Sequence, residues 1–167
     1  MSSTRSLRIN GIVPESVVDG PGIRYAVFTQ GCPHRCPGCH NPQTHDFSGG
    51  EEADPERMLS EIREDPLLRG VTFSGGEPFC QAGALAGIAR QVHAMGLDVV
   101  TYSGFTYEQL LEMAEADPDT EALLNETDLL IDGPFLIGER DLSLLFRGSR
   151  NQRILNLKEM RAAGKDA

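Results

Sequence analysis

The chain has 167 residues, a hydrophobic content of 40% and a formal net charge of -10. This length is typical of one domain with a substantial core, so we expect a single domain over residues 1–167. The acidic balance argues against nucleic acid as the main partner, because phosphate binding requires a basic surface. We find no apolar run of membrane-spanning length and no signal-peptide segment, and we therefore expect no membrane partner and a cytoplasmic location.

Strand-like and helix-like segments alternate along the chain. Residues 23–30 are rich in β-branched and aromatic side chains and lead into a loop with three cysteines. Asp54 followed by Pro55 is typical of a helix start, and Thr106 with Gln109 has the spacing of a capping box. A further helix is expected over residues 81–95, ending at Gly96. The remaining expected strands are 70–74, 97–102, 128–132 and 153–157.

This alternation predicts an α/β fold with a parallel sheet. A closed barrel of eight units needs about 250 residues, so we expect an open partial (β/α) barrel of parallel strands with a lateral gap. Ligands bind at the carboxyl ends of the strands in such folds. Four sequence features fall at such ends: the cysteine loop and residues 75–78, 103–104 and 132–134.

The cysteine loop contains Cys32, Cys36 and Cys39 in a Cys-x3-Cys-x2-Cys pattern. An iron–sulfur cluster usually takes four cysteine ligands, so three close together would leave one iron open for a substrate. A zinc site of three cysteines with His34, His40 or His45 remains an alternative on spacing alone. A disulfide framework is disfavoured, because nothing marks the chain as secreted. We expect the fourth cysteine, Cys80, to be a buried structural thiol.

A second motif, Ser74-Gly75-Gly76-Glu77-Pro78, follows a predicted strand and precedes a predicted helix. The glycines permit positive φ and close approach of the backbone. Carbonyl groups and the Glu77 carboxylate are suited to accepting hydrogen bonds from an ammonium group. By itself the motif is also compatible with a plain turn, and its weight comes from its position one β-α unit after the cysteine loop.

Together these motifs resemble the radical S-adenosylmethionine (SAM) enzymes. Residues 19–24, Asp-Gly-Pro-Gly-Ile-Arg, and residues 39–42, Cys-His-Asn-Pro, resemble the glycyl-radical activating enzymes within that superfamily. The segments 128–135 and 146–153 are similar to one branch, whose members activate anaerobic ribonucleoside-triphosphate reductases. The similarity extends over residues 12–154, nearly the whole chain.

The resemblance implies two cofactors, a 4Fe-4S cluster and S-adenosyl-L-methionine. The three loop cysteines would hold three irons, and the amino and carboxylate groups of SAM would chelate the fourth. Gly75, Gly76 and Glu77 would bind the SAM amino group. Gly38, Cys39 and His40 would lie beside the adenine, although many relatives have an aromatic residue where Gly38 stands.

Two further positions on the expected rim, Ser103 and Asp132, are candidates for contacts with SAM. Related pyruvate formate-lyase activators carry a lysine two residues after an aspartate that matches Asp132, whereas this chain has Pro134. Another cation is then needed for the SAM carboxylate, and the candidates lie in a segment that could also be a solvated loop: Arg147, Arg150 and Arg153.

The implied function is that of a radical SAM oxidoreductase that generates a glycyl radical on the large chain of anaerobic ribonucleotide reductase. Asp19 and Gly20 could border the entrance for that partner, or form a plain turn. Electrons would come from a donor such as flavodoxin or ferredoxin. One alternative partner is pyruvate formate-lyase or another glycyl-radical enzyme. An alternative of another class is a non-catalytic zinc-binding interaction module.

Overall fold

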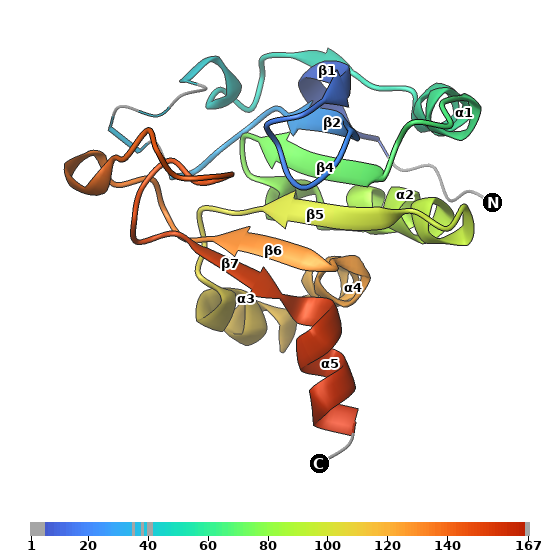
Figure 1. The fold of residues 1–167 in the computed structure, drawn as a ribbon. Coiled ribbons are helices and arrows are strands. Elements are labelled where there is room, and N and C mark those ends of the chain that lie inside the picture. The colour runs from blue at the N-terminus through green and yellow to red at the C-terminus, as the bar shows by residue number, and fades with distance from the viewer. Residues whose placement is uncertain (1–5, 35, 38, 40–41, 166–167) are drawn as a thin grey trace.

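The computed structural model describes residues 6–34, 36–37, 39 and 42–165. In this part of the chain the strands are β1 (Arg8–Ser16), β2 (Arg24–Thr29), β3 (Glu51–Glu52), β4 (Gly70–Gly75), β5 (Asp98–Tyr102), β6 (Leu129–Asp132) and β7 (Arg153–Asn156). They form one sheet in the order β3-β1-β2-β4-β5-β6-β7 (Figure 1). The fold is therefore α/β, as predicted.

The sheet is parallel only in its centre. Strands β2, β4, β5 and β6 run parallel, whereas β1 and β3 at one edge and β7 at the other are antiparallel to their neighbours. The prediction that all strands are parallel is wrong at both edges. The reason is local: residues 17–23 and 133–152 contain no crossover α-helix, and a chain that returns without a crossover pairs antiparallel.

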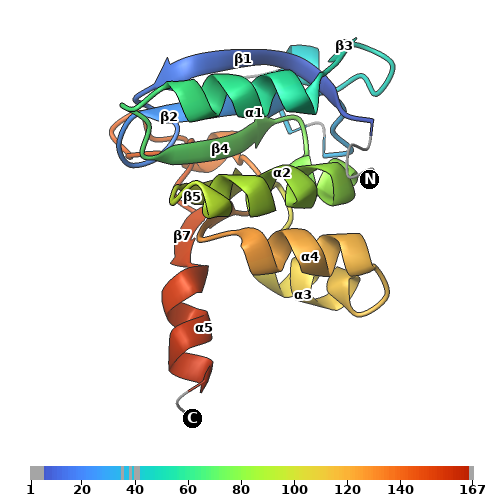
Figure 2. The same cartoon turned by 90° about the vertical axis from the view of Figure 1, so that its right-hand side faces the viewer.

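The α-helices are α1 (Pro55–Glu64), α2 (Ala82–Ala94), α3 (Tyr107–Ala114), α4 (Pro118–Glu126) and α5 (Leu157–Lys165), with short 3-10 turns at Pro42–Thr44, Pro78–Gln81 and Ile137–Glu139. Helices α1 to α4 cover one face of the sheet, and α5 projects from its edge (Figure 2). The main core lies between these helices and the sheet face that carries Val27, Phe73, Val99 and Leu130. No helix in the described residues is long and apolar enough to cross a membrane.

The opposite face of the sheet carries a fully buried arginine, Arg24. Its guanidinium donates to Thr72 Oγ1 at 2.7 Å, to the Pro21 carbonyl at 2.9 Å and to Asp98 Oδ1 at 2.5 Å. Burial lowers the pKa of Arg24, and the charge of Asp98 opposes that shift. These bonds fix the loop between β1 and β2 against the middle of the sheet, where Figure 1 shows it crossing in front of β4 and β5.

Most predicted elements are confirmed within a few residues. Asp54 caps α1 by accepting from Arg57 N, and Thr106 and Gln109 form a capping box on α3. Four elements were not predicted: β1, whose sequence is interrupted by Gly11 and Pro14, the two-residue strand β3, and the helices α4 and α5. Strand β1 forms because its edge pairing with β2 supplies the hydrogen bonds, with irregular register at two places.

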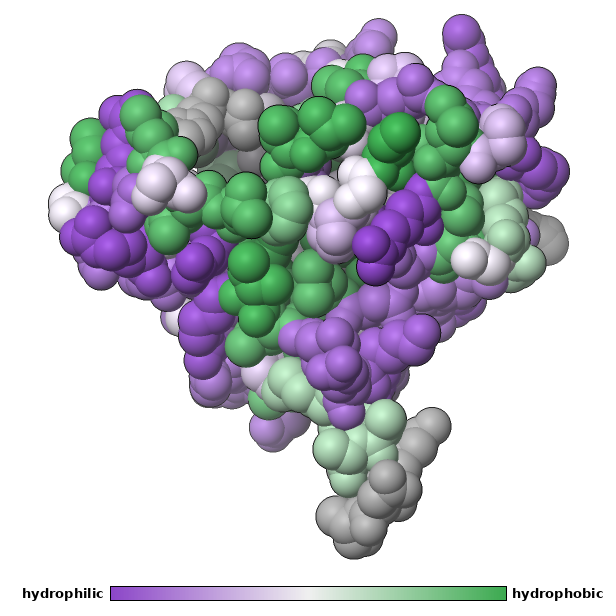
Figure 3. Space-filling model, viewed as in Figure 1, coloured by the Kyte–Doolittle hydropathy of each residue, from purple (hydrophilic) through white to green (hydrophobic). Residues whose placement is uncertain are grey.

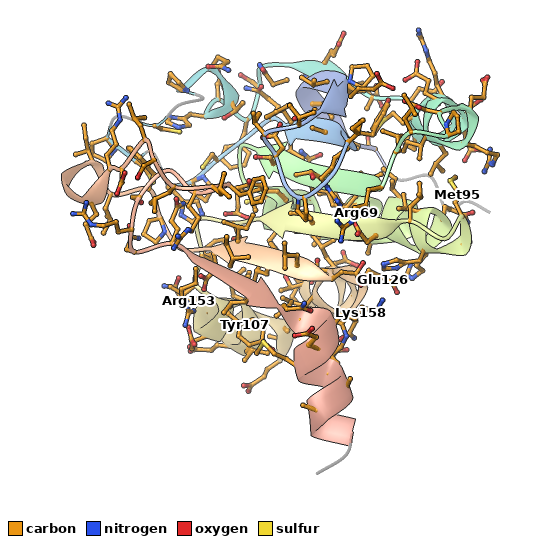
Figure 4. All side chains as sticks on the ribbon, viewed as in Figure 1. Arg69, Met95, Tyr107, Glu126, Arg153 and Lys158 are labelled. Atoms are coloured by element: carbon orange, nitrogen blue, oxygen red, sulfur yellow. The ribbon has the colours of Figure 1, made fainter. Side chains whose placement is uncertain are left out.

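A charged cluster closes the end of the sheet away from the cysteine loop. His93 on α2 places Nδ1 2.8 Å from Glu126 Oε1 and Nε2 2.7 Å from Asp128 Oδ2. Glu126 is labelled at that end of the molecule in Figure 4. Burial by itself would lower the pKa of His93, but the hydrogen bonds to Asp128 and Glu126 and their charges raise it overall. The pair of carboxylates therefore favours a protonated imidazole.

The stability contribution of His93 should depend on pH. A raised folded-state pKa stabilises the fold fully below the unfolded value of 6.5, and this contribution is lost as the pH rises through the folded value. We expect His93→Gln to lower the free energy of unfolding by about 1 kcal/mol near pH 5 and by much less near pH 9. Urea unfolding across this range measures it. Arg90→Gln, an exposed change on the same helix, should show no such trend, and an equal loss at both pH values would contradict the assignment.

Candidate functional site

A cavity of about 420 Å³ lies at the carboxyl ends of the central strands. Its wall combines residues from every segment that the sequence placed at this edge: the cysteine loop, the loop after β4, the loop after β5 and the segment after β6. The lining polar residues and glycines include Asp19, Cys32, His34, Cys36, Cys39, His45, Gly75, Gly76, Ser103, Gly104 and Arg147. The predicted convergence of these loops on one rim is therefore present.

The cysteine loop is closed at its base by backbone hydrogen bonds. Gly31 N donates to the Thr44 carbonyl at 2.6 Å, and Cys32 N donates to the His45 carbonyl at 3.2 Å. Cys39 N donates to the Cys36 carbonyl at 3.1 Å, which joins the backbones of two of the cysteines. Gly38 and His40, the predicted neighbours of adenine, lie outside the described residues.

All three loop cysteines line the cavity. Cys32 is buried, Cys36 and Cys39 are half-buried, and no disulfide joins them. Within the described part of the chain, no three His, Cys, Asp or Glu side chains are drawn together closely enough to form a metal site by themselves. The loop thus supplies thiols around a shared space rather than a closed cage of ligands.

The glycine pair at the end of β4 packs closely against the end of β2 and the start of the cysteine loop. Gly75 has φ +98°, and a Cβ there would lie 2.5 Å from Thr29 N; at Gly76 it would lie 2.4 Å from the Gly31 carbonyl oxygen. Any larger residue is excluded at both positions. Gly76 N and Glu77 N donate to the carbonyls of Thr29 and Gly31. The two loops are therefore joined backbone to backbone.

The Glu77 carboxylate is completely buried and surrounded by donors. Oε1 lies 2.6 Å from His34 Nε2 and accepts from Gly104 N at 2.8 Å, while Oε2 accepts from Phe79 N at 3.1 Å. The Ser103 hydroxyl lies within 3.1 Å of both oxygens. One carboxylate thus connects the cysteine loop, the loop after β4 and the loop after β5.

This arrangement places Glu77 behind the cavity wall. Gly75 and Gly76 line the cavity and Glu77 does not. His34 is held between Glu77 and Phe105, whose ring meets the imidazole edge to face at 4.5 Å. The sequence suggested that the Glu77 carboxylate accepts from a ligand ammonium, whereas here its acceptor positions are used by the protein itself. We assign Glu77 a positioning role.

The carboxylate oxygens of Asp132 also accept hydrogen bonds from other residues of the protein. Asp132 is buried, accepts from Tyr107 N at the start of α3 at 2.7 Å, and pairs with Arg153, whose guanidinium also contacts Glu108. Figure 4 shows Arg153 and Tyr107 side by side at this edge of the sheet. The hydrogen bonds to Asp132 and then to Glu108 raise the pKa of Arg153. Neither Asp132 nor Arg153 lines the cavity.

The loop before β2 contributes one wall through Asp19. Its Oδ2 accepts from Ser16 Oγ at 2.5 Å, and the Asp19 carbonyl accepts from Thr72 Oγ1. Tyr102 also lines the cavity, and its pKa is raised by burial and then by the charge of Asp19. Gly20, by contrast, is buried with φ +134°, and a Cβ there would lie 2.9 Å from the Arg24 side chain.

Cys80 corrects a prediction from the sequence. It is exposed rather than buried, because it lies in the 3-10 turn before α2 and not on a core-facing helix position. Partial enclosure of the thiol, followed by the charges of Glu77 and Cys32, raises its pKa to about 11. A neutral thiol at this pKa is a poor metal ligand, and Cys80 does not line the cavity.

Sequence reasoning missed the apolar part of the cavity wall. The lining includes Val18 and Phe28 from one side and Phe135, Leu142, Leu144 and Phe146 from the segment after β6. Hydrophobic residues spread over this face of the molecule in Figure 3. Isolated apolar residues in loops carry no periodic signal, so only the fold reveals that they meet.

Comparison with known proteins identifies the family of the chain. A family model for a 4Fe-4S single cluster domain matches residues 18–155. The anaerobic ribonucleoside-triphosphate reductase-activating protein of Vibrio cholerae is 33% identical over 83% of this chain and 91% of its own length. The chain belongs to the family of these activating proteins.

Two further activating proteins are similar to this chain in sequence. The anaerobic ribonucleoside-triphosphate reductase-activating protein of Escherichia coli K12 is 30% identical over 87% of this chain and 96% of its own length. The pyruvate formate-lyase-activating enzyme of Clostridium pasteurianum is 40% identical over 63% of this chain and 48% of its own length.

The thiol groups that this chain brings to the cavity fit an iron–sulfur cluster. Cys32, Cys36 and Cys39 offer three thiols to one cavity, and thiolates are the ligands that such clusters use. His45 adds a second observation: its Nε2 is buried at the cavity and has no hydrogen-bond partner among the described residues. A buried polar nitrogen of this kind is costly unless a ligand group pairs with it.

The hydrogen bonds of Glu77 predict that replacing its carboxylate by an amide strongly destabilises the fold. Glu77→Gln preserves the shape but replaces one acceptor oxygen by an NH₂ group that faces backbone N–H donors. We expect the free energy of unfolding to fall by about 2–3 kcal/mol. Denaturant unfolding measures the change. Glu64→Gln, on the exposed side of α1, is the matched control and should shift stability by about 0.5 kcal/mol or less; equal effects of both changes would refute the role of Glu77.

Proposed function

We propose that this protein is a radical SAM activase that reductively cleaves S-adenosyl-L-methionine and generates a glycyl radical on an anaerobic ribonucleoside-triphosphate reductase. The observation that carries the proposal is the meeting of three cysteines with a Gly-Gly loop in one cavity, in a chain of the activating-protein family. SAM and a glycine-bearing segment of the reductase are the two substrates of this proposal.

The residues have distinct tasks in the proposed reaction. Cys32, Cys36 and Cys39 hold a 4Fe-4S cluster, which when bound supplies one electron to the sulfonium substrate. The backbone of Gly75 and Gly76 forms the wall beside them, against which the methionine part of SAM would lie, and its close packing on β2 and Gly31 fixes that wall. Glu77 and Ser103 hold that wall in place through the buried hydrogen bonds described above. Positioning of this kind is a large part of catalysis.

The architecture we propose for residues 1–167 is one domain with an open partial barrel. Two features support it: α1 to α4 cover one face of the sheet, and side chains of the other face, including Phe28, Ser74 and Tyr102, line the cavity. A cluster with thiolate ligands requires reduced cysteines, which favours a cytoplasmic location. The electron donor in this proposal is a small redox protein such as flavodoxin or ferredoxin.

The partner surface in our proposal is an apolar rim formed by Val17, Val18, Leu142 and Leu145. Val17, Val18, Leu142 and Leu145 are 67%, 70%, 78% and 72% exposed, and Val18 and Leu142 also line the cavity. Exposed apolar side chains gathered at the mouth of a site are typical of a protein-binding surface. Asp19, which follows Val18 directly, lies where the partner segment would enter.

A second candidate differs only in the partner. The 40% identity with a pyruvate formate-lyase-activating enzyme favours glycyl-radical chemistry, but the alignment covers 48% of that enzyme. The activating proteins of ribonucleotide reductase align over nearly their whole length, which favours them. The remaining candidate, a zinc module, predicts zinc in place of iron and no reaction with SAM.

The cluster assignment predicts the outcome of removing each thiol. After anaerobic reconstitution with iron and sulfide, reduction and addition of SAM, the unchanged protein should form 5′-deoxyadenosine. Cys32→Ala, Cys36→Ala and Cys39→Ala should each reduce the yield by about 100-fold or more and lower the bound iron, because each removes one of three ligands. Iron analysis and chromatography of the nucleoside provide the two readouts.

The matched control is Cys80→Ser, because this thiol is exposed and lies outside the cavity wall. It should retain both iron and deoxyadenosine formation. Stoichiometric zinc in the purified protein together with no deoxyadenosine would contradict the proposal. A glycyl-radical signal in electron paramagnetic resonance, recorded on separately prepared reductase and pyruvate formate-lyase, then decides between the two partners.

The apolar rim predicts a defect confined to the partner step. Val17→Asp introduces a charge on the rim without changing the cavity wall, and should lower the rate of glycyl-radical formation by about 10-fold at limiting reductase. SAM binding should be unchanged. Leu67→Asp, which changes a similarly exposed side chain between α1 and β4, is the control. An equal defect in both variants, or none in Val17→Asp, would argue against this surface.

A further inference from the structure

Arg147 lines the cavity and forms no salt bridge with a carboxylate among the described residues, although Asp141 lies near enough to feel its charge. Its Nη1 donates to the Gln152 carbonyl at 3.0 Å, whereas its Nε is buried without a hydrogen-bond partner among the described residues. The side chain lines the same cavity as the three cysteines. A buried guanidinium nitrogen that lacks an acceptor is costly, so an acceptor group brought to this side chain by a ligand would be stabilising.

The position of Arg147 is fixed by its surroundings. Gln152 Oε1 accepts from Gly148 N at 2.8 Å and from Ser149 N at 3.1 Å, and Gln152 Nε2 donates to the Gly133 carbonyl at 3.1 Å. The preceding residue, Phe146, has φ +63°, a conformation that bulky residues rarely adopt. Backbone strain held by a network of this kind is characteristic of ligand-binding segments.

The other cations of this segment are unsuited to the same task. Arg153 pairs with Asp132 and Glu108, and Arg150 is exposed and does not line the cavity. The carboxylate of Asp141 lines the cavity, but Oδ1 accepts from the amide and hydroxyl of Ser143, at 2.9 and 2.6 Å. These bonds, and then the charges of Arg150 and Arg147, lower the pKa of Asp141.

We propose that the guanidinium of Arg147 binds the carboxylate of the amino-acid part of S-adenosyl-L-methionine. This inference rests on the function proposed above. A guanidinium presents several N–H donors in one plane, and a carboxylate that chelates iron through one oxygen leaves the other oxygen to accept from them. The carboxylate-bearing Asp19 lines the same cavity. The cavity therefore offers a positive group, Arg147, and a negative group, Asp19, to a ligand that carries both a carboxylate and positive charge.

A cycle of protein and ligand changes tests the contact directly. We would measure the dissociation constants of SAM and of decarboxylated SAM for the cluster-containing protein, unchanged and as Arg147→Gln. The expected result is a 10- to 100-fold loss of SAM affinity in the variant, with the affinity for decarboxylated SAM changed by about 2-fold or less. Arg147→Lys should show an intermediate loss for SAM only, because it retains the charge without the planar set of N–H donors.

The control is Arg150→Gln, which removes an exposed arginine of the same segment and should leave both affinities unchanged. Equal weakening of both ligands by Arg147→Gln, or no weakening of either, would overturn the proposal while leaving the activase function intact. Should Arg147→Gln fail to retain its cluster, Arg147→Lys decides by the same comparison. Absence of SAM binding by the unchanged protein would instead remove the proposed function, and this contact with it.

Discussion

The buried carboxylate of Glu77 is the interaction on which the geometry of the site depends. A carboxylate removed from water needs several donors to compensate for the lost solvation, and here the donors come from three separate loops. Because any loop that moves away leaves a buried charge unsatisfied, the cysteine loop, the Gly-Gly loop and the loop after β5 are constrained to move together. Gly75 and Gly76 extend the same constraint, since their contact with β2 and Gly31 leaves no space for a Cβ.

The sheet brings together the loops that the Glu77 hydrogen bonds connect. Parallel strands bring their carboxyl ends to one edge, so loops that are far apart in sequence become neighbours there. The two faces of the sheet then have different tasks. One packs against α1 to α4 and forms the core, whereas the other holds Arg24 beneath the loop that carries Asp19. The Arg24 network and the Glu77 network thus support the cavity wall from behind, and each includes residues that line the cavity: Asp19 in the first, and His34, Ser103 and Gly104 in the second.

The elements with local signals could be predicted from the sequence, and those that depend on tertiary contacts could not. The caps at Asp54 and Thr106, the four central strands and the gathering of loops at one edge follow from residue type and spacing. The direction of the edge strands depends on how the chain returns to the sheet, which residues 133–152 do not reveal by composition. Asp132 was expected at the site because it ends a strand, but its side chain is used by Arg153 and by the start of α3. Spacing identifies which residues reach the rim, and only packing decides which side of the loop each side chain occupies.

The distribution of charge around the cavity connects the two substrates of the proposed reaction. A small zwitterionic sulfonium with a carboxylate at one end can be oriented by fixed charges, and Arg147 and Asp19 are fixed charges because Gln152 and Ser16 hold the segments that carry them. A protein segment needs no such charge, and in our proposal it would meet the exposed apolar side chains of Val17, Val18, Leu142 and Leu145 instead. In this proposal SAM is bound by charged groups inside the cavity, and the partner protein is bound by apolar side chains at its rim. The separation has a kinetic consequence: the small ligand can be bound and oriented before the partner arrives, and the partner then covers the mouth and excludes water from a reactive centre. A closed barrel could offer the first of these steps, whereas the second requires a mouth wide enough for a polypeptide.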